Sequence, residues 1–456
     1  MNKKEVASMN DYEIENGRKG KSKISRKDFL LAMGVVGVAV GGYASYKHFG
    51  KSSAKGKILI IGGGAAGISI ANRLLNLLAD PDITIVDPSD THFYQPGFTL
   101  IGGGVYSPSQ VVKSQRDCMP TDVKWVKESV VEVNPDRNYA ITSAGKKLEY
   151  DYMVLVPGIQ LNYDQIEGFS REQIGKNGIY SIYDFGGAAA TWQGILDMEK
   201  HGGGRMIFSD THTKLKCGGA PKKINMMAER YLTKKGIRDK YSIELLSTMK
   251  NMFDIPIIRT RLAEIYEQRN IPVKFEQRLK WIDIAGKKAG FEQHASEGKE
   301  IITESYDFLH IVPPMSAPDF IPNCGLASEG VEGGWASVDK HTMVHTKYAN
   351  IISLGDASNL PTSKTSAAIR IQLPIAAANL VSLMEGKEPK EKYNGYTACP
   401  IVTDYGKVLM AEFDYDKKMQ PTIPFIDLGK EHDIWWMLKV YGLKNIYFHG
   451  MLNGLM

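Results

Sequence analysis

A glycine-rich loop between a short apolar run and a helical stretch is the feature that most constrains the fold of this chain. Residues 57–61, Lys-Ile-Leu-Ile-Ile, predict a buried β-strand, and the loop leads into a predicted helix at residues 68–78. Gly62 permits a tight turn, Gly64 lets the backbone approach a pyrophosphate, and Gly67 lets the helix pack closely on the strand. The segment therefore predicts a Rossmann-like dinucleotide-binding unit.

A second predicted strand, residues 83–86, strengthens this interpretation because it ends in Asp87. Asp87 stands twenty residues after the last glycine of the loop, where an acid that binds a ribose belongs. Strand, loop, helix, strand and acid thus follow in the order that a bound dinucleotide requires, and we expect that dinucleotide to be FAD.

Two later segments read as the strands that return to this unit. Residues 151–156 form a buried-strand pattern that ends at Gly158, and the pattern resembles the strand and turn that re-enter the FAD domain of disulfide-reductase-like flavoproteins. Residues 351–354 predict a strand that delivers Gly355 and Asp356 toward the ribityl chain of FAD. Capping of the next helix is a second role that Asp356 could serve at the same time.

The region between these segments, about residues 162–322, predicts a second Rossmann-like half without a nucleotide loop. Its opening strand, 205–209, is preceded by three glycines, residues 202–204, but is followed by Asp-Thr-His-Thr at 210–213. Glycines before a strand cannot line the loop after it, so NAD(P) binding loses its main physical support.

The amino-terminal 55 residues are basic and resemble an export signal. They carry eleven Lys and Arg against five Asp and Glu, which leaves the rest of the chain near neutrality and argues against a nucleic-acid partner. Residues 25–30, Ser-Arg-Lys-Asp-Phe-Leu, resemble a twin-arginine signal with lysine at the second arginine. A weakly apolar run follows at 31–44, shorter than the roughly 20 residues that span a membrane. We expect export, with an uncleaved anchor or a cytoplasmic tail as alternatives.

Several longer motifs resemble the sulfide:quinone oxidoreductases, particularly the branch that includes the mitochondrial enzyme. The resemblance runs from about residue 56 to 450, and it implies FAD, a quinone acceptor and membrane association. Its segments are His-Phe-Tyr-Gln-Pro at 92–96, Lys-Cys-Gly-Gly-Ala-Pro-Lys-Lys at 216–223, Val-Pro-Pro-Met-Ser at 312–316, Asn-Leu-Pro-Thr-Ser-Lys-Thr at 359–365, Tyr-Thr-Ala-Cys-Pro at 396–400 and Ala-Glu-Phe-Asp-Tyr at 411–415.

The resemblance assigns the chemistry to a cysteine pair beside the flavin. In that family sulfide attacks the pair, one cysteine keeps the added sulfur as a persulfide, and the other delivers electrons to the flavin. Cys217 matches the flavin-side cysteine. Lys216 adds positive charge, and Pro221 predicts the first turn of a helix, so a thiolate at 217 would be stabilised. The alternative is a small buried residue beside a Gly-Gly turn.

The resemblance places the second cysteine at position 357, where this chain has Ala357. Cys399 is the nearest remaining candidate, but it matches a Cys-Pro that family members carry in addition to the redox pair, so we favour a core residue there. Without a resolving thiol a two-cysteine relay cannot run. A one-cysteine version would need sulfide or a small thiol to accept the sulfur.

The acceptor side involves two further predictions. Lys364, before a predicted helix at 367–383, could present positive charge to the reduced flavin, and a solvated lysine in a capping turn is the alternative. The stretch 435–452 mixes Trp, Tyr, Phe and Leu with lysines, which suits a bilayer interface where lysines reach outward. An apolar face that packs on a neighbouring subunit is the other interpretation, so a homo-oligomer stays open.

These inferences predict an α/β protein with two Rossmann-like dinucleotide-binding domains of the disulfide-reductase-like flavoprotein type, plus a C-terminal membrane-associating region. The expected divisions are 1–55 (signal or anchor), 56–160 with 325–395 (FAD domain), 161–324 (second domain) and 396–456 (C-terminal region). Electrons would pass from sulfide to quinone at the periplasmic face of a bacterial membrane, with a sulfur acceptor as partner and no metal. A different reductant, or a partnership with a cytochrome subunit, are the alternatives. We expect Cys217 and Lys364 to be catalytic, and FAD to be bound by Gly62, Gly64, Ala65, Ala66, Gly67, Asp87, Gln95, Val130, Gly158, Gly355 and Asp356.

Overall fold

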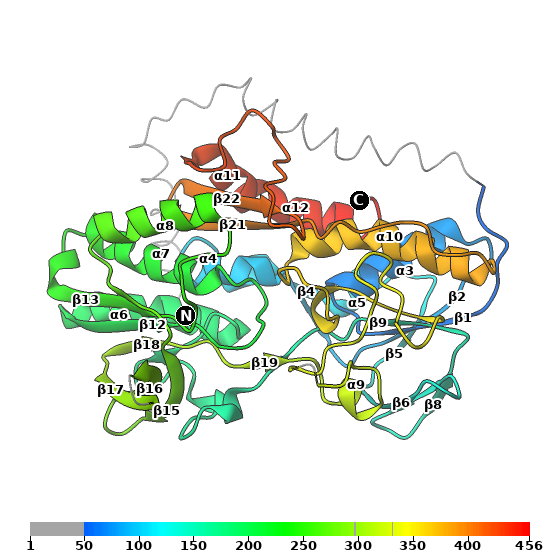
Figure 1. Ribbon diagram of the computed structural model, residues 1–456, viewed down its shortest axis with the longest axis horizontal. Coiled ribbons are helices and arrows are strands. Elements are labelled where there is room, and N and C mark those ends of the chain that lie inside the picture. Colours follow the sequence, from blue (N-terminus) through cyan, green and yellow to red (C-terminus); the bar gives the residue numbers. More distant parts are fainter. Residues whose placement is uncertain (1–49, 296–297, 331) are drawn as a thin grey trace. The chain divides into compact units, whose positions relative to one another are not determined.

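The computed structural model describes residues 50–295, 298–330 and 332–456. Two five-stranded sheets organise this part of the chain and lie side by side (Figure 1). Most of the predicted export signal, residues 1–49, lies outside the described residues.

The first sheet is wholly parallel, with the strand order β20-β9-β1-β2-β5. Its central strand is an apolar run that is buried from its second residue onward, as expected for a strand covered on both faces. Helices α3 and α10 pack against each other above the sheet (Figure 1). The bounds are β1 Lys57–Ile61, α3 Ala65–Leu77, β2 Asp82–Val86, β5 Lys124–Val126, β9 Tyr152–Leu155, β20 Ile351–Ser353 and α10 Ser366–Met384.

Strand order places the glycine loop at the functional edge of this sheet. The chain leaves β1 between β2 on one side and β9 on the other, so the loop lies where the strand order reverses. Ligands of open α/β sheets bind at such a switch point, beyond the carboxyl ends of the strands. Smaller elements surround the edge: β3 Thr91–Phe93, α4 Phe98–Gly102, β4 Val112–Ser114, α5 Gln115–Cys118, β6 Val130–Asn134, β7 Tyr139–Thr142, β8 Lys147–Glu149, β10 Gln160–Leu161, β19 Met315–Ser316 and α9 Phe320–Asn323.

The second sheet is also parallel, in the order β11-β18-β12-β13-β14. The three glycines that precede its first long strand form the connection between helix α6 and strand β12. Gly202 caps α6 in the left-handed conformation that favours glycine, and Gly204 is the first residue of β12. They therefore lie at the opposite end of the strand from a nucleotide loop. The bounds are β11 Ile179–Tyr180, α6 Phe185–His201, β12 Gly204–Ser209, α7 Ala220–Lys234, β13 Tyr241–Leu246, α8 Pro256–Gln268, β14 Val273–Lys274 and β18 Phe308–His310.

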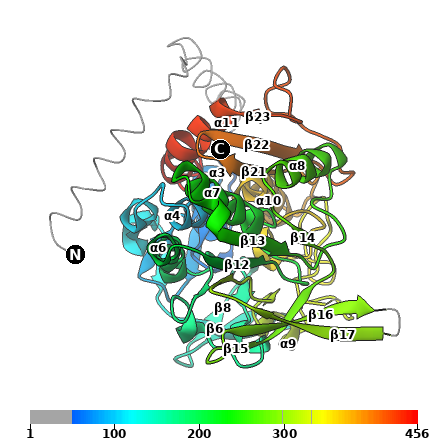
Figure 2. The ribbon, with the colours of Figure 1, turned by 90° about the vertical axis from the view of Figure 1, so that its left-hand side faces the viewer.

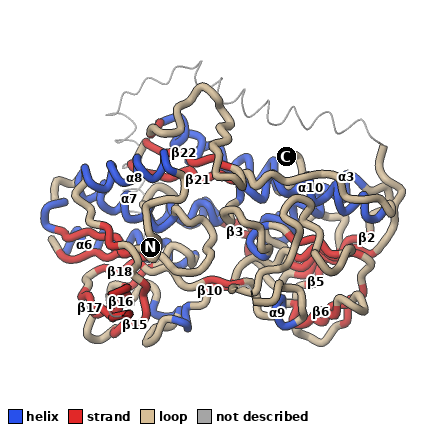
Figure 3. Tube along the Cα trace, in the orientation of Figure 1, coloured by secondary structure: helices blue, strands red, loops and turns tan. Residues whose placement is uncertain are grey.

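A twisted antiparallel sheet, β15-β16-β17, extends from the second sheet (Figure 2). Its strands are β15 Arg278–Asp283, β16 Lys288–Ala295 and β17 Gly298–Ser305. The confirmed fold class is thus an α/β protein with two Rossmann-like units. Figure 3 shows how helices and strands alternate in both.

The C-terminal region adds a hairpin and a run of short helices. The hairpin joins β21 Thr397–Asp404 to β22 Lys407–Phe413, and β21 packs against α7 of the second unit. Strand β23 Glu431–His432 follows, then α11 Asp433–Met437, a π-helical turn Leu438–Gly442, α12 Leu443–Asn445 and a second π-helical turn Ile446–Met451.

The aromatic stretch of this region is mostly turned inward, which corrects part of its interfacial interpretation. Trp435, Tyr447 and Phe448 are buried, whereas Tyr441 is 61% exposed. Lys439, expected to reach outward, is only 4% exposed. Packing against the rest of the protein therefore uses most of the apolar side chains that the sequence pattern assigned to a bilayer.

Candidate active site

The glycine loop after β1 has the geometry of a pyrophosphate cradle. A Cβ on Gly62 would lie 2.3 Å from the carbonyl oxygen of Val156, and a Cβ on Gly67 would lie 1.8 Å from that of Gly62. A Cβ on Gly64 would meet no protein atom within 4 Å. The first and third glycines are therefore required by packing, while the second leaves the backbone open to a ligand at the start of α3.

The end of β2 is tied directly to this loop. Asp87 accepts a hydrogen bond from the backbone N–H of Gly63 at 2.6 Å and another from Ser89 at 2.9 Å. Ala65 and Ala66 form the first turn of α3, and no side chain caps that turn. Its free N–H groups and the dipole of the helix favour an anion. The residues present thus fit the phosphates of FAD.

The two returning segments meet the same edge. Gly158 follows β9 with a φ of +86°, and a Cβ there would meet no protein atom within 4 Å. Gly355, with a φ of +66°, lies beside Ala66 and donates its N–H to the Gln372 side chain at 2.9 Å. Asp356 is in the same short helical turn, where burial raises the pKa of its carboxyl. These residues lie close enough to the loop to line one cofactor site.

The other two predicted FAD contacts lie further along the edge. Gln95 accepts a hydrogen bond from Lys216 Nζ at 2.7 Å, so it joins the FAD half to the cysteine loop. Val130 opens β6 and packs on the apolar cluster of the first sheet.

The loop that carries Cys217 joins the second unit to the first. Cys217 donates its backbone N–H to the carbonyl of Lys364 at 2.9 Å, and its own carbonyl accepts from Tyr183 Oη at 3.3 Å. Its φ is +53°, a left-handed value that is uncommon for residues other than glycine. Strained backbone of this kind is concentrated at functional sites, where the surrounding contacts hold it in place.

The structure brings Cys399 against Cys217, although 182 residues separate them in the chain. Cys399 lies on β21, and its thiol donates a hydrogen bond to the sulfur of Cys217. This bond, together with nearby lysines, holds the pKa of Cys217 well below its usual value, while the same bond and burial raise the pKa of Cys399. Cys399 is buried, as the sequence indicated, but it is also the neighbour that Cys217 was expected to lack.

Two buried lysines surround the thiol pair. Lys223 Nζ lies 3.2 Å from Cys217 Sγ and also contacts Cys399. Burial lowers the pKa of Lys223, but its charge interactions and hydrogen bonds with Cys217 and Cys399 together outweigh burial, so the pKa is raised overall. Lys439 adds a second positive charge from the C-terminal region, and burial lowers its pKa to about 8. The pair is therefore one reactive thiolate and one protonated thiol in a positive environment.

Lys364 is held by the chain itself. Its Nζ donates to the carbonyls of Asp356 at 2.7 Å and Ser358 at 2.8 Å, and lies 3.8 Å from the centroid of the Trp335 ring. It is 6% exposed, so the alternative of a solvated lysine is wrong, and burial lowers its pKa to about 7. Ala357 is fully buried in the apolar cluster of the first sheet.

Sequence reasoning did not assign Lys223 or Lys439 to this site, and it considered Cys399 as a partner but favoured a core role for it. Cys399 was disfavoured because the resemblance assigned it to a Cys-Pro outside the redox pair. The sequence offered a weak signal for Lys223, which falls among apolar residues of a predicted helix. Only the packed structure shows that the ammonium groups of Lys223 and Lys439 lie near the thiols.

Known proteins resemble this chain over most of its length. Residues 56–188 match the family model described as pyridine nucleotide-disulphide oxidoreductase. The mitochondrial sulfide:quinone oxidoreductase of Dictyostelium discoideum is 40% identical over 87% of this chain and 86% of its own, and that of Mus musculus is 36% identical over 87% and 86%. In fold, the solved sulfide:quinone oxidoreductase of Aquifex aeolicus matches with a TM-score of 0.74 at 20% identity, over 88% of this chain and 92% of its own. The chain therefore belongs to the sulfide:quinone oxidoreductase family.

Proposed function

We propose that this protein oxidises sulfide with Cys217 and Cys399 as its redox pair and passes the electrons through FAD to a quinone. The observation that carries the proposal is the placement of Cys399 beside the cysteine loop, where Lys223 contacts both thiols and the backbone of Cys217 is bonded to the FAD half. The names of the relatives suggest the substrates, and the contacts around Cys217 support our choice of residues. Cys399 takes the role that the sequence comparison had assigned to position 357.

The pKa values of the two thiols set the direction of the first step. In the oxidised pair, a hydrosulfide ion attacks one sulfur and the other cysteine leaves as a thiolate, and the thiol of lower pKa leaves faster. Cys217 has the lower pKa, so the attack falls on Cys399. A bond forms between the incoming sulfur and Cys399 Sγ, the disulfide breaks, and Cys399 becomes a persulfide.

The lysines make this step favourable. Lys223 and Lys439 attract the hydrosulfide anion and stabilise the departing Cys217 thiolate. A nucleophilic acceptor, such as a small thiol or a second sulfide, then takes the outer sulfur and leaves Cys399 as a thiolate. Re-forming the disulfide removes two electrons from the pair.

FAD, when bound, accepts those two electrons and delivers them to the quinone. The chain holds it through the loop of Gly62, Gly64 and Gly67, with Asp87, Gly355 and Asp356 at the same edge. Lys364 fixes the site indirectly, because its carbonyl binds the Cys217 backbone and its ammonium binds the Asp356 carbonyl.

An anaerobic titration of the purified flavoprotein with sulfide tests this proposal. Cys217→Ser and Cys399→Ser should each abolish sulfide-dependent bleaching of the flavin while FAD stays bound. Cys118→Ser and Cys324→Ser are matched controls, since both residues are free cysteines away from the pair, and they should bleach normally. Normal bleaching in Cys399→Ser would remove the two-cysteine mechanism and leave a single-cysteine route, while a wild type that sulfide cannot bleach would favour another reductant.

The quinone requires contact with a membrane, and we propose that the C-terminal region makes it. Phe425 and Tyr441 are 79% and 61% exposed. Helix α10 is long and apolar enough to cross a membrane, but it packs against α3 and bonds Gly355 through Gln372, as a core helix does. The periplasmic location remains a prediction that rests on residues outside the described part, and the relatives named above are mitochondrial proteins.

Binding to lipid vesicles tests the membrane surface. Replacing Phe425 and Tyr441 by serine should weaken sedimentation with vesicles, because both rings would lose their apolar contact with lipid. Val131→Ser is the control, since Val131 is 54% exposed on β6. An equal loss of vesicle binding in the control, or no loss in the double variant, would argue against membrane contact through Phe425 and Tyr441.

A further inference from the structure

The two cysteines lie on elements that run side by side from different parts of the chain. Cys217 precedes α7, and Cys399 lies on β21. At this end the contact is close, because a Cβ on Gly219 would lie 2.8 Å from Cys399 Sγ and 3.6 Å from Ile401 Cγ1. Glycine at this position lets the start of α7 approach the strand.

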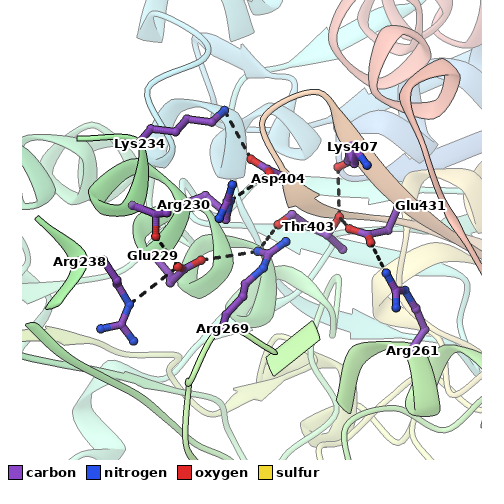
Figure 4. A network of polar contacts seen from close by, with 11 residues as sticks. Glu229, Arg230, Lys234, Arg238, Arg261, Arg269, Thr403, Asp404, Lys407 and Glu431 are labelled. Carbon is purple, nitrogen blue, oxygen red and sulfur yellow. Dashed lines mark hydrogen bonds and ion pairs between the residues drawn. The ribbon is translucent and has the colours of Figure 1, made fainter. Parts of the chain in front are cut away.

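A cluster of charged side chains joins the same two elements at their other ends (Figure 4). Arg230 Nε donates to Asp404 Oδ2 at 2.9 Å, and Lys234 Nζ lies 3.4 Å from Asp404 Oδ1. Eleven residues of α-helix, from Gly219 to Arg230, rise about 17 Å, and five residues of strand, from Cys399 to Asp404, also rise about 17 Å. The helix and the strand are thus matched in length between the thiol end and the charged end.

A second bridge runs beside the first. Glu229, whose side chain is 3% exposed, lies 3.7 Å from Arg269 and 3.8 Å from Arg238. Arg269 also donates to the carbonyl of Thr403 on β21. Through Arg269, the charge of Glu229 on α7 is therefore connected to the strand (Figure 4).

The apolar contact between α7 and β21 cannot fix their relative position alone. Ile224, Ile401 and Cys399 belong to one apolar cluster, and hydrophobic contact is not directional. A disulfide is far less tolerant, since its Cβ atoms must lie about 3.5–4.5 Å apart. The Arg230–Asp404 ion pair is hydrogen-bonded and so has a defined geometry that resists sliding of the helix along the strand, while Glu229 and Arg269 attract each other at 3.7 Å without a hydrogen bond.

We infer that Arg230, Asp404, Glu229 and Arg269 form an ionic clamp that sets the register of α7 on β21 and thereby holds Cys217 and Cys399 at disulfide distance. These four are positioning residues, because they touch neither thiol. The inference rests on the proposed function of the cysteine pair, and it adds that the ease of closing the disulfide is controlled from the far end of the helix.

The test is the thiol–disulfide equilibrium of the pair in the full-length, FAD-loaded protein, without sulfide or quinone. The protein is equilibrated in glutathione redox buffers, quenched with acid and alkylated, and the peptides with Cys217 and Cys399 are quantified by mass spectrometry. Arg230→Gln and Asp404→Asn should each lower the equilibrium constant for disulfide formation about tenfold, a change of about 30 mV in reduction potential. The double variant should be no worse than either single one, because both remove the same contact.

Arg205→Gln is the matched control. Arg205 is 28% exposed and pairs with Glu244 and Glu304, while Arg230 is 25% exposed, so both replacements remove a similar half-buried ion pair. The control should lower the melting temperature without shifting the equilibrium. Arg230→Lys, which keeps the charge, should recover most of the wild-type equilibrium and remains informative if the glutamine variant does not fold.

The outcomes separate the two proposals. An equilibrium that is unchanged in Arg230→Gln and Asp404→Asn, or shifted as much in the control, overturns the clamp and leaves the cysteine pair standing. A wild-type protein whose cysteines form no disulfide in any buffer overturns the pair, and the clamp with it.

Discussion

Replacing Lys223 by methionine should raise the pKa of Cys217 without removing the thiol or the fold around it. Methionine keeps an unbranched apolar side chain in the buried site but loses the ammonium that lies 3.2 Å from Cys217 Sγ. The cation stabilises the thiolate and not the thiol, so its loss favours the protonated form. The pKa of Cys217 should therefore rise.

The magnitude follows from the distance. Two unit charges 3.2 Å apart interact by about 5 kcal/mol at an effective dielectric constant near 20. Desolvation offsets part of this energy, and hydrogen bonds to charged groups contribute a net ~1.5–3 kcal/mol. At about 1.4 kcal/mol for each pKa unit, the pKa of Cys217 should rise by about one to two units. Lys439 and Cys399 remain and limit the change.

The assay is the pH dependence of alkylation of Cys217 by iodoacetamide, followed at the level of the peptide. Only the thiolate reacts, so the midpoint of the alkylation rate against pH reports the pKa of Cys217, and this midpoint should lie about one to two pH units higher in the variant than in the wild type. At pH values below both midpoints, the variant should react about ten- to a hundredfold more slowly than the wild type, given the shift expected above.

Lys222→Met is the control for this experiment. Lys222 is 3% exposed and Lys223 is 2% exposed, but Lys222 lies 3.7 Å from Asp210 and not beside a thiol. It should leave the alkylation profile unchanged. An identical profile for wild type and Lys223→Met would show that the short contact does not activate Cys217, and the electrostatic account of the site would then be wrong.

Two glycines offer further predictions. Gly67→Ala should abolish FAD binding, measured by flavin absorbance after purification, because its Cβ would lie 1.8 Å from the carbonyl oxygen of Gly62. A variant that still binds a full complement of FAD would contradict the assignment of this loop to the pyrophosphate. Gly219→Ala should lower the free energy of unfolding by ~1–3 kcal/mol through overpacking and should slow disulfide formation, since its Cβ would press on Cys399 Sγ at 2.8 Å. Gly218→Ala, which meets only a Leu215 methyl at 3.9 Å, should change neither, and an equal effect there would assign the loss to the loop backbone.

Much of the FAD half could be predicted from the sequence because its determinants are local. The predicted strand at 57–61 coincides with β1, and the strand at 83–86 lies within β2. Gly67 has a local steric reason, since its Cβ would clash with the carbonyl oxygen of Gly62, whereas Gly62 is constrained by Val156 and Gly64 by no protein atom. The helix predicted at 68–78 begins three residues earlier, since the loop glycines and alanines already belong to its first turn.

The sequence offered Cys399 as a candidate partner of Cys217 but could not establish that the two thiols meet. Cys399 lies in a strand of a hairpin whose position depends on how α7, β21 and the charged cluster at their ends pack, and none of these contacts leaves a periodic pattern. Lys439 shows the same limit. Among aromatic residues it resembles a membrane-facing lysine, and only the packed C-terminal region turns it toward the thiols.

By itself, the sequence determined that this chain folds into nucleotide-binding α/β units and that Cys217 stands where its chemistry begins, because backbone conformation and strand pattern depend on near neighbours. The tertiary structure alone decided which thiol faces Cys217 and which lysines lower its pKa. Cys399 and Lys439 stand more than a hundred positions from Cys217 in the chain, and Lys223 stands six positions from it, but only close packing brings all three side chains to the same sulfur.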